Sequence, residues 1–600
     1  MNVSDQIANW LVSQGIEQVF AVTGGGAMFL NHAIAGHPQL HCMFMHHEQA
    51  CAMAAEGYAR ISGKPAVVMT TSGPGAINAL NGVFGAYTDS IPMIIISGQI
   101  KRETCLSFYD LPELRQLGDQ EGPTIAMASP ICKFAKLITS ETDIETALPK
   151  AYHEAISGRP GPTWLDIPLD IQQSKIKIQF SAPDVETSVD KESIKLACKE
   201  IVKRLCESHK PLILAGTGVR LSNTQNRLLQ LIEQIRVPLA TAWTHDLIPS
   251  DHELFAGRPG TIGTRPGNFC LQSADFLLVL GSRLNIRQTS YNWESFAKNA
   301  WVAQVDVDRA ELNKPTVKVD LGVEANLTLF FEILEEQISK VEIPNYQSWV
   351  EWCQKVGKRY NVAKEHIQKP EEPLNPYVVV RRVFQNLRSN DVIATGNASA
   401  CILPFQIGNL EHGQRLFSNS GSASMGHDLP AALGAASAAQ VDGNRRVICF
   451  AGDGSIQMNI QELQTLKTND LNLIILIINN SGYLSIWQTH ENFFGRVVGA
   501  TPASGVEFPD FIKVALSYGI EAYTISTVDD LYKLDELLQH NGPLLIELIV
   551  DPSQEFAPRI KSRVDEAGKF ITPELDDMHP FLSESDRDTV RAEAQKIRSS

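Results

Sequence analysis

The sequence predicts an α/β fold with three doubly wound parallel-sheet domains, and two observations support it. At 600 residues the chain is longer than one hydrophobic core can organise. Short unbroken apolar runs, typical of strands buried on both faces, alternate with helix-patterned segments. We expect a first domain over 1–175, a central Rossmann-like domain over 190–340, a third domain over 375–551 and a polar tail over 552–600.

The composition argues against several classes of function. A formal net charge of −16 disfavours nucleic acid or an anionic membrane surface as a partner. No apolar run approaches the roughly 20 residues that span a bilayer, and the opening segment lacks the pattern of a signal peptide. The 10 cysteines are scattered without a C-x-x-C pair, which is typical of reduced thiols. We therefore expect a cytoplasmic protein with neither a nucleic-acid nor a membrane partner.

In the first domain, an apolar run leads into a glycine-rich turn. The run 19–22 is followed by Gly24, Gly25 and Gly26, which allow a ligand or another chain to approach the backbone closely. A simple flexible turn is the alternative. Further along, Glu48 falls where a short strand gives way to a helix. Its role could be catalytic, or it could be a surface glutamate that the helix dipole stabilises.

In the third domain, the segment 447–480 has the pattern strand, turn, helix, strand. A Gly-Asp-Gly turn centred on Asp453 ends the first strand, Ser455 is placed to cap the helix, and the second strand stops at Asn480. Both strand ends are expected at the sheet edge where α/β proteins bind ligands. Asp453 and Asn480 offer hard oxygen atoms for Mg2+, and the glycines allow amides to approach phosphate. The alternative is an ordinary turn and an ordinary strand end.

Five stretches in this order and spacing resemble the acetolactate synthase group of thiamine diphosphate (ThDP) enzymes. The resemblance extends to about residue 550 and implies a ThDP pyrimidine-binding first domain and a diphosphate-binding third domain. The stretches are HHEQACAMAAEGYAR from His46, TSGPGAINALNG from Thr71, AYTDSIPMIIISGQ from Ala86, GPTWLDIPLD from Gly161 and GDGSIQMNIQEL from Gly452.

The resemblance assigns roles to individual residues. It implies that Glu48 hydrogen-bonds the aminopyrimidine ring, that Gln120 is the active-site glutamine and that Gly25 lines the reaction chamber. Met425 would support the bent cofactor. The implied Mg2+ ligands are Asp453, Asn480 and the carbonyl of Gly482. The other implied cofactor-binding residues are Gly24, Gly26, Asn78, Ser424, Gly452, Gly454 and Ser455.

The central domain resembles the FAD-binding domain of acetolactate synthases. FAD is therefore a third expected cofactor, in a structural rather than a redox role, and an empty Rossmann-like domain is the alternative. The residues implied in FAD binding are Gly257, Gly281, Arg283, Arg287 and Asp306.

The resemblance implies a ThDP- and Mg2+-dependent carboligase that decarboxylates pyruvate and transfers the two-carbon unit to a second 2-oxo acid. The segment 481–489 and the pair His427-Asp428 depart from the synthase pattern, so the acceptor stays open. The alternatives are acetyl transfer to a nucleotide-linked keto sugar, simple decarboxylation of a 2-oxo acid, and a non-catalytic scaffold. The resemblance also implies a homo-oligomer, either a dimer or a tetramer, with active sites between chains.

Overall fold

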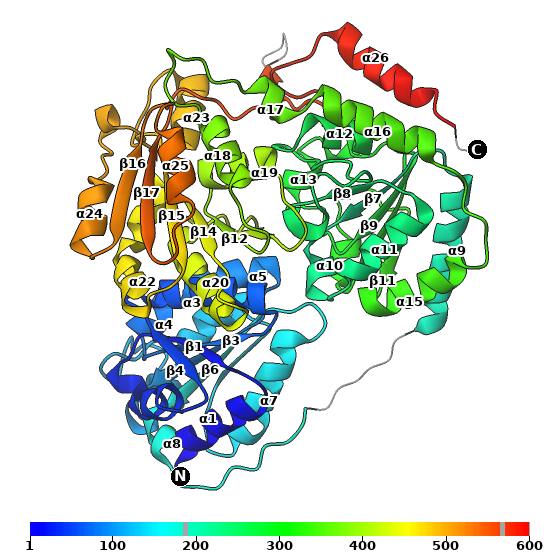
Figure 1. Cartoon of the computed structure of the whole chain (residues 1–600). Coiled ribbons are helices and arrows are strands. Elements are labelled where there is room, and N and C mark those ends of the chain that lie inside the picture. The colour runs from blue at the N-terminus through cyan, green and yellow to red at the C-terminus, as the bar shows by residue number, and fades with distance from the viewer. Residues whose placement is uncertain (184–189, 565–569, 599–600) are drawn as a thin grey trace.

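The computed structural model describes residues 1–183, 190–564 and 570–598 and contains three large parallel β-sheets (Figure 1). Strands alternate with helices in each sheet, because a parallel pair needs a crossover connection. The predicted fold class is therefore confirmed. Within the described part of the chain, no helix is both long and apolar enough to cross a membrane.

The first sheet has the strand order β2-β1-β3-β4-β6-β5. It is buried on both faces: Val68 of β3 packs into one core, and its neighbours Val67 and Met69 pack into another. The strands are β1 (Gln18–Ala21), β2 (His41–Phe44), β3 (Ala66–Thr70), β4 (Met93–Gln99), β5 (Phe134–Leu137) and β6 (Pro162–Pro168). The main helices are α1 (Val3–Ser13), α3 (Glu48–Ser62), α4 (Pro74–Asn78), α5 (Leu80–Asp89) and α7 (Asp143–Ile156).

The third sheet repeats the topology of the first. Its order is β13-β12-β14-β15-β17-β16, so in both sheets the second strand along the chain pairs with the first, and the first with the third. The strands are β12 (Val392–Thr395), β13 (Arg415–Ser418), β14 (Val447–Gly452), β15 (Leu473–Asn479), β16 (Glu521–Ile525) and β17 (Leu544–Ile549). The main helices are α18 (Pro376–Gln385), α19 (Ser399–Ile407), α20 (Asp428–Val441), α22 (Leu463–Asn469) and α23 (Leu484–Phe494).

The central sheet has the order β11-β10-β9-β7-β8. Its core also takes Trp349 from α16 and Val590 from the C-terminal helix α26, which lies across this domain (Figure 1). The strands are β7 (Pro211–Ala215), β8 (Leu239–Thr241), β9 (Phe276–Leu280), β10 (Trp301–Asp306) and β11 (Leu321–Glu324). The main helices are α9 (Lys191–Glu207), α11 (Gln225–Ile235), α12 (Arg265–Ser273), α15 (Leu327–Ile338), α16 (Gln347–Arg359) and α26 (Glu584–Gln595).

Helices α3 and α20 join the first and third domains by an unusually close contact. A Cβ atom added to Gly57 of α3 would lie 2.0 Å from the carbonyl oxygen of Ala431, and one added to Gly434 of α20 would lie 1.8 Å from that of Ala54. Each backbone therefore occupies the space that a side chain would need on the other helix. Both helices are rich in buried alanine, which permits this approach.

We expect Gly434→Ala to destabilise the protein by about 1–3 kcal/mol, the usual cost of overpacking a core. Gly357→Ala on α16 is the matched control, because a Cβ there meets nothing within 4 Å. Glycine-to-alanine exchange in an unobstructed helix stabilises it by up to about 1 kcal/mol. Scanning calorimetry should show a lower midpoint for the first variant only. Equal midpoints would mean that the two helices can separate without cost.

Candidate active site

Each sheet has a point in its interior where the strand order reverses, and α/β proteins bind ligands at such a point, beyond the carboxyl ends of the strands. In the first sheet this point lies between β1 and β3, which lead into the glycine turn 24–26 and the loop 71–73. In the third sheet it lies between β12 and β14, which lead into Gly396 and Asp453. The topology thus brings the residues singled out by the sequence to two equivalent sheet edges.

Glu48 is the first residue of α3, and its environment is closely defined. The residue is 8% exposed, and Nδ2 of Asn78 donates a hydrogen bond to its Oε2 at 3.0 Å. A Cβ on Gly75 would lie 2.9 Å from its Oε1, so a glycine is needed for α4 to approach the carboxyl group. The sequence predicted both Glu48 and Asn78, and the structure brings them together.

The three glycines after β1 pack against the loop after β3. A Cβ on Gly24 would lie 2.5 Å from Cβ of Thr71, and one on Gly26 would lie 2.5 Å from Oγ of Ser72. Gly25 faces open space, since its Cβ would meet nothing within 4 Å. The glycine loop can therefore present its backbone at Gly25 to a ligand.

Gln120 lies on a neighbouring loop with its backbone in the left-handed region, at φ +62°. Its carbonyl oxygen would lie 2.3 Å from a Cβ on Gly73, so the Gln120 loop packs directly against the loop after β3. The structure thus places the Gln120 loop beside the loop that precedes Asn78.

Asp453 and Asn480 form the polar edge of the third sheet. The backbone N–H groups of Asn480 and Gly482 each donate to Oδ2 of Asp453 at 3.1 Å, and the N–H of Gly454 donates to its Oδ1 at 2.7 Å. Burial raises the pKa of Asp453 to about 6, against the opposing effect of these amides.

The hydrogen bonding of the Asn480 side chain indicates that a cation would fit at this edge. Its Nδ2 donates to Oγ of Ser399, whereas its Oδ1 is buried and has no hydrogen-bond partner in the described structure. An unpartnered oxygen beside a buried carboxylate is the arrangement that a hard divalent cation satisfies. No cluster of three or more His, Cys, Asp or Glu side chains suited to a metal occurs among the described residues, so the cation would need further oxygen ligands.

Ser455 does not cap the helix, which corrects the sequence prediction. Helix α21 (Asp453–Ile456) begins two residues earlier with Gly452 as its N-cap, so Ser455 lies in the first turn. Its Oγ instead accepts a hydrogen bond from the N–H of Gly426 at 2.8 Å. Ser455 therefore ties the Asp453 turn to the segment that carries Ser424 and Met425.

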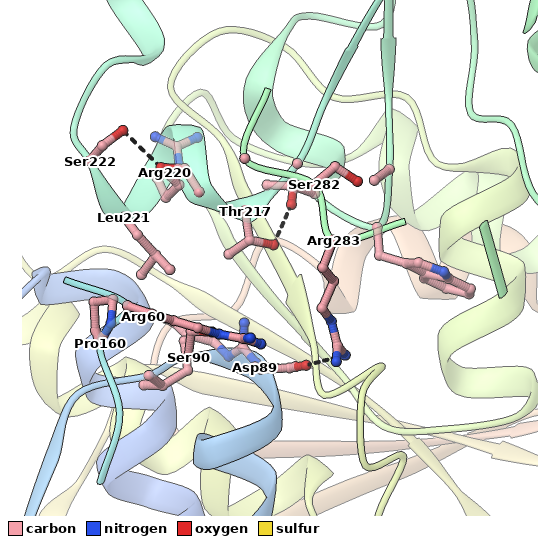
Figure 2. A pocket seen from close by; sticks show the side chains of 18 of the residues that line it. Arg60, Asp89, Ser90, Pro160, Thr217, Arg220, Leu221, Ser222, Ser282 and Arg283 are labelled. Atoms are coloured by element: carbon pink, nitrogen blue, oxygen red, sulfur yellow. Dashed lines mark hydrogen bonds and ion pairs between the residues drawn. The ribbon is translucent and has the colours of Figure 1, made fainter. Parts of the chain in front are cut away.

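A cavity of about 800 Å3 lies where the three domains meet (Figure 2). It includes the point of the central sheet where the strand order reverses, between β7 and β9. Of the predicted FAD residues, Gly281, Arg283 and Asp306 line it, whereas Gly257 and Arg287 do not. A Cβ on Gly257 would lie 2.8 Å from the backbone nitrogen of Gly267. Gly257 is therefore needed for close packing against the first turn of α12.

The cavity wall contains residues that the sequence analysis missed. Gly216-Thr217-Gly218 follows the apolar run of β7, and this strand-to-glycine signal could have identified it. Arg159 comes from the first domain and forms an ion pair with Asp308 at 2.8 Å, which only the folded structure reveals. Arg283 approaches Asp89 of the first domain to 3.7 Å (Figure 2).

Family models for thiamine pyrophosphate enzymes match all three domains. The N-terminal TPP binding domain matches residues 1–120, the central domain residues 198–334 and the C-terminal TPP binding domain residues 396–548. These matches agree with the three sheets.

The relatives of the chain include acetolactate synthase large subunits. Acetolactate synthase isozyme 1 large subunit of Escherichia coli is 31% identical, over 92% of this chain and 95% of the relative. The large subunit of Lactococcus lactis is 30% identical, over 93% and 94%, and the chloroplastic enzyme of Arabidopsis thaliana is 30% identical, over 93% and 83%. The resemblance noted in the sequence is therefore confirmed, and the chain belongs to the acetolactate synthase large-subunit family of thiamine pyrophosphate enzymes.

Proposed function

We propose that this protein is a ThDP- and Mg2+-dependent carboligase that decarboxylates pyruvate and transfers the two-carbon unit to a second 2-oxo acid. The observation that carries the proposal is the pairing of the Glu48–Asn78 hydrogen bond with the Asp453 and Asn480 oxygen site, in a chain of this family. The relatives favour this reaction over acetyl transfer to a keto sugar and over simple decarboxylation. The two polar sites also disfavour a non-catalytic scaffold.

ThDP supplies the nucleophilic carbon and the electron sink for decarboxylation when it is bound. The protein supplies a proton-transfer group and a fixed geometry. Glu48 would hold a proton at the pyrimidine ring, because Asn78 fixes its carboxyl group and the surrounding chain largely excludes water. Gly25 would present backbone to the reacting groups, and Gln120 would contact the substrate from the adjoining loop.

Mg2+ would be held by Oδ of Asp453, Oδ1 of Asn480 and the carbonyl oxygen of Gly482, with the diphosphate completing its coordination. The backbone around Gly452, Gly454 and Ser455 would receive the diphosphate, while Ser424 and Met425 would support the rest of the cofactor. The buried, unpartnered Oδ1 of Asn480 supports the cation.

A second copy of the chain would complete the active site. No hydrogen bond or ion pair joins Glu48 or Asn78 to Asp453 or Asn480 within the described part of one chain. Large apolar side chains are exposed beside the first site: Met28 is 52% exposed, Phe44 52% and Ile77 37%. Such surfaces are typical of interfaces, so a homodimer or a homotetramer accounts for them.

FAD would occupy the cavity between the three domains as a structural cofactor. The cavity volume falls within the range of about 300–1,000 Å3 usual for small-molecule sites. Oε1 of Gln288 and Nε of Arg220, both in its lining, are buried without a hydrogen-bond partner in the described structure. The carboxylate of Asp306, at the end of β10, suits the hydroxyl groups of a ribose.

Glu48→Gln should lower kcat for acetolactate formation by at least about 100-fold, because the amide cannot carry the catalytic proton. Thermal unfolding should be nearly unchanged, since the amide keeps the size of the side chain. Glu371→Gln, an exposed site, is the matched control. Turnover equal to the control would remove Glu48 from the mechanism.

Asp453→Asn should weaken Mg2+-dependent ThDP binding by more than about tenfold, because the cation loses its charged ligand. Isothermal titration calorimetry with and without a chelator measures the effect, and the exposed Asp529→Asn serves as the control. If the chelator still weakened binding to Asp453→Asn as it does in the wild type, the metal assignment would be wrong.

The purified protein, incubated with FAD and desalted, should show flavin absorbance. Asp306→Ala should reduce the bound flavin per chain, because a half-buried acceptor is lost, whereas the exposed Asp251→Ala should not. A wild-type protein without bound flavin would show that the central domain serves another ligand or none.

A further inference from the structure

The segment 419–427 connects β13 to α20 and carries Ser424 and Met425. Its backbone includes two left-handed residues, Ala423 at φ +54° and Gly426 at φ +84°. A non-glycine residue in this region costs free energy, which surrounding contacts must offset. The contacts that fix the two ends of the segment therefore decide where Met425 is held.

Both ends of the segment contact one carboxyl group on α3. At the start, Nδ2 of Asn419 donates to Oε2 of Glu56 at 2.9 Å. At the end, Nε2 of His427 lies 3.2 Å from the same oxygen. The three residues are buried, with exposures of 4% for Asn419, 1% for His427 and 0% for Glu56.

The other side of the Glu56 carboxyl group is anchored. Nε and Nη2 of Arg60 donate to its Oε1 at 2.9 and 2.7 Å, and Arg60 also pairs with Asp89 at 2.6 Å. Burial opposes ionisation, but His427 and Arg60 outweigh it and hold the pKa of Glu56 at about 2. A charged group held from one side can fix the segment on its other side.

We propose that Glu56 is a positioning residue for the cofactor: it clamps Asn419 and His427 and so holds the Met425 segment in its binding conformation. Glu56 lies on the helix that begins with Glu48, so in the proposed homo-oligomer one rigid element of each chain would place the proton-transfer group of one active site and the cofactor support of another. The proposal rests on the proposed function, because it assumes that the segment contacts ThDP.

The test compares two variants of the clamp with a matched control. Glu56→Gln removes the charge. Asn419→Ala removes the contact with Glu56 and the hydrogen bond that Oδ1 of Asn419 accepts from the N–H of Ala423 at 3.0 Å, and leaves the Glu56–Arg60–Asp89 pairs intact. Asp391→Asn is the control, since Asp391 is an equally buried carboxylate paired with an arginine, Arg446, away from the segment. The ThDP dissociation constant, kcat and the near-ultraviolet circular dichroism of the bound cofactor are measured well below each unfolding midpoint.

Both clamp variants should raise the ThDP dissociation constant by about tenfold or more, lower kcat and change the dichroism of the cofactor. Asp391→Asn should lower only the unfolding midpoint. The double variant should lose less affinity than the two single losses combined, because the two residues hold the same segment through one contact. Unchanged affinity in both clamp variants, or equal loss in the control, would overturn the proposal. A wild-type protein that does not bind ThDP would instead overturn the proposed function.

Discussion

The close contact between α3 and α20 is the constraint on which the arrangement of the site depends. Gly57 and Gly434 each leave the space of a side chain to the backbone of the other helix, so the two helices have little freedom to slide or separate. Glu48 begins α3, and the segment 419–427 leads into α20. One helix pair therefore fixes Glu48 relative to the Met425 segment within each chain, although these residues lie hundreds of positions apart. In the proposed homo-oligomer it thereby relates the two active sites to which one chain contributes.

The repeated topology explains why the functional residues lie on loops after strands. The first and third sheets share one strand order, so both have a reversal point between their first and third strands. At this edge the first sheet carries the backbone of the glycine turn 24–26 and the carboxylate of Glu48, and the third sheet carries Asp453 and Asn480. The central sheet has its own reversal point, and the large cavity opens there. A common fold thus provides three sheet edges of the kind at which α/β proteins bind ligands, and the loop residues give each edge its own chemistry.

Features that depend on residues close together in the sequence were predictable from it. The apolar runs predicted the buried strands, and the Gly-Asp-Gly turn and Asn480 were correctly placed at adjoining strand ends. Local signals also misled: Ser455 looked like a helix cap but bonds Gly426, and Gly257 serves packing. Contacts between distant segments were invisible, because neither Glu56 nor Asn419 carries a local pattern that indicates its partner, 363 residues away.

The most direct test of the account is product analysis after incubation of the purified protein with pyruvate, ThDP and Mg2+ and no other acceptor. The account predicts acetolactate as the main product, with one CO2 released for each molecule formed. Release of CO2 with acetaldehyde and without acetolactate would contradict the proposal that a second 2-oxo acid is the acceptor.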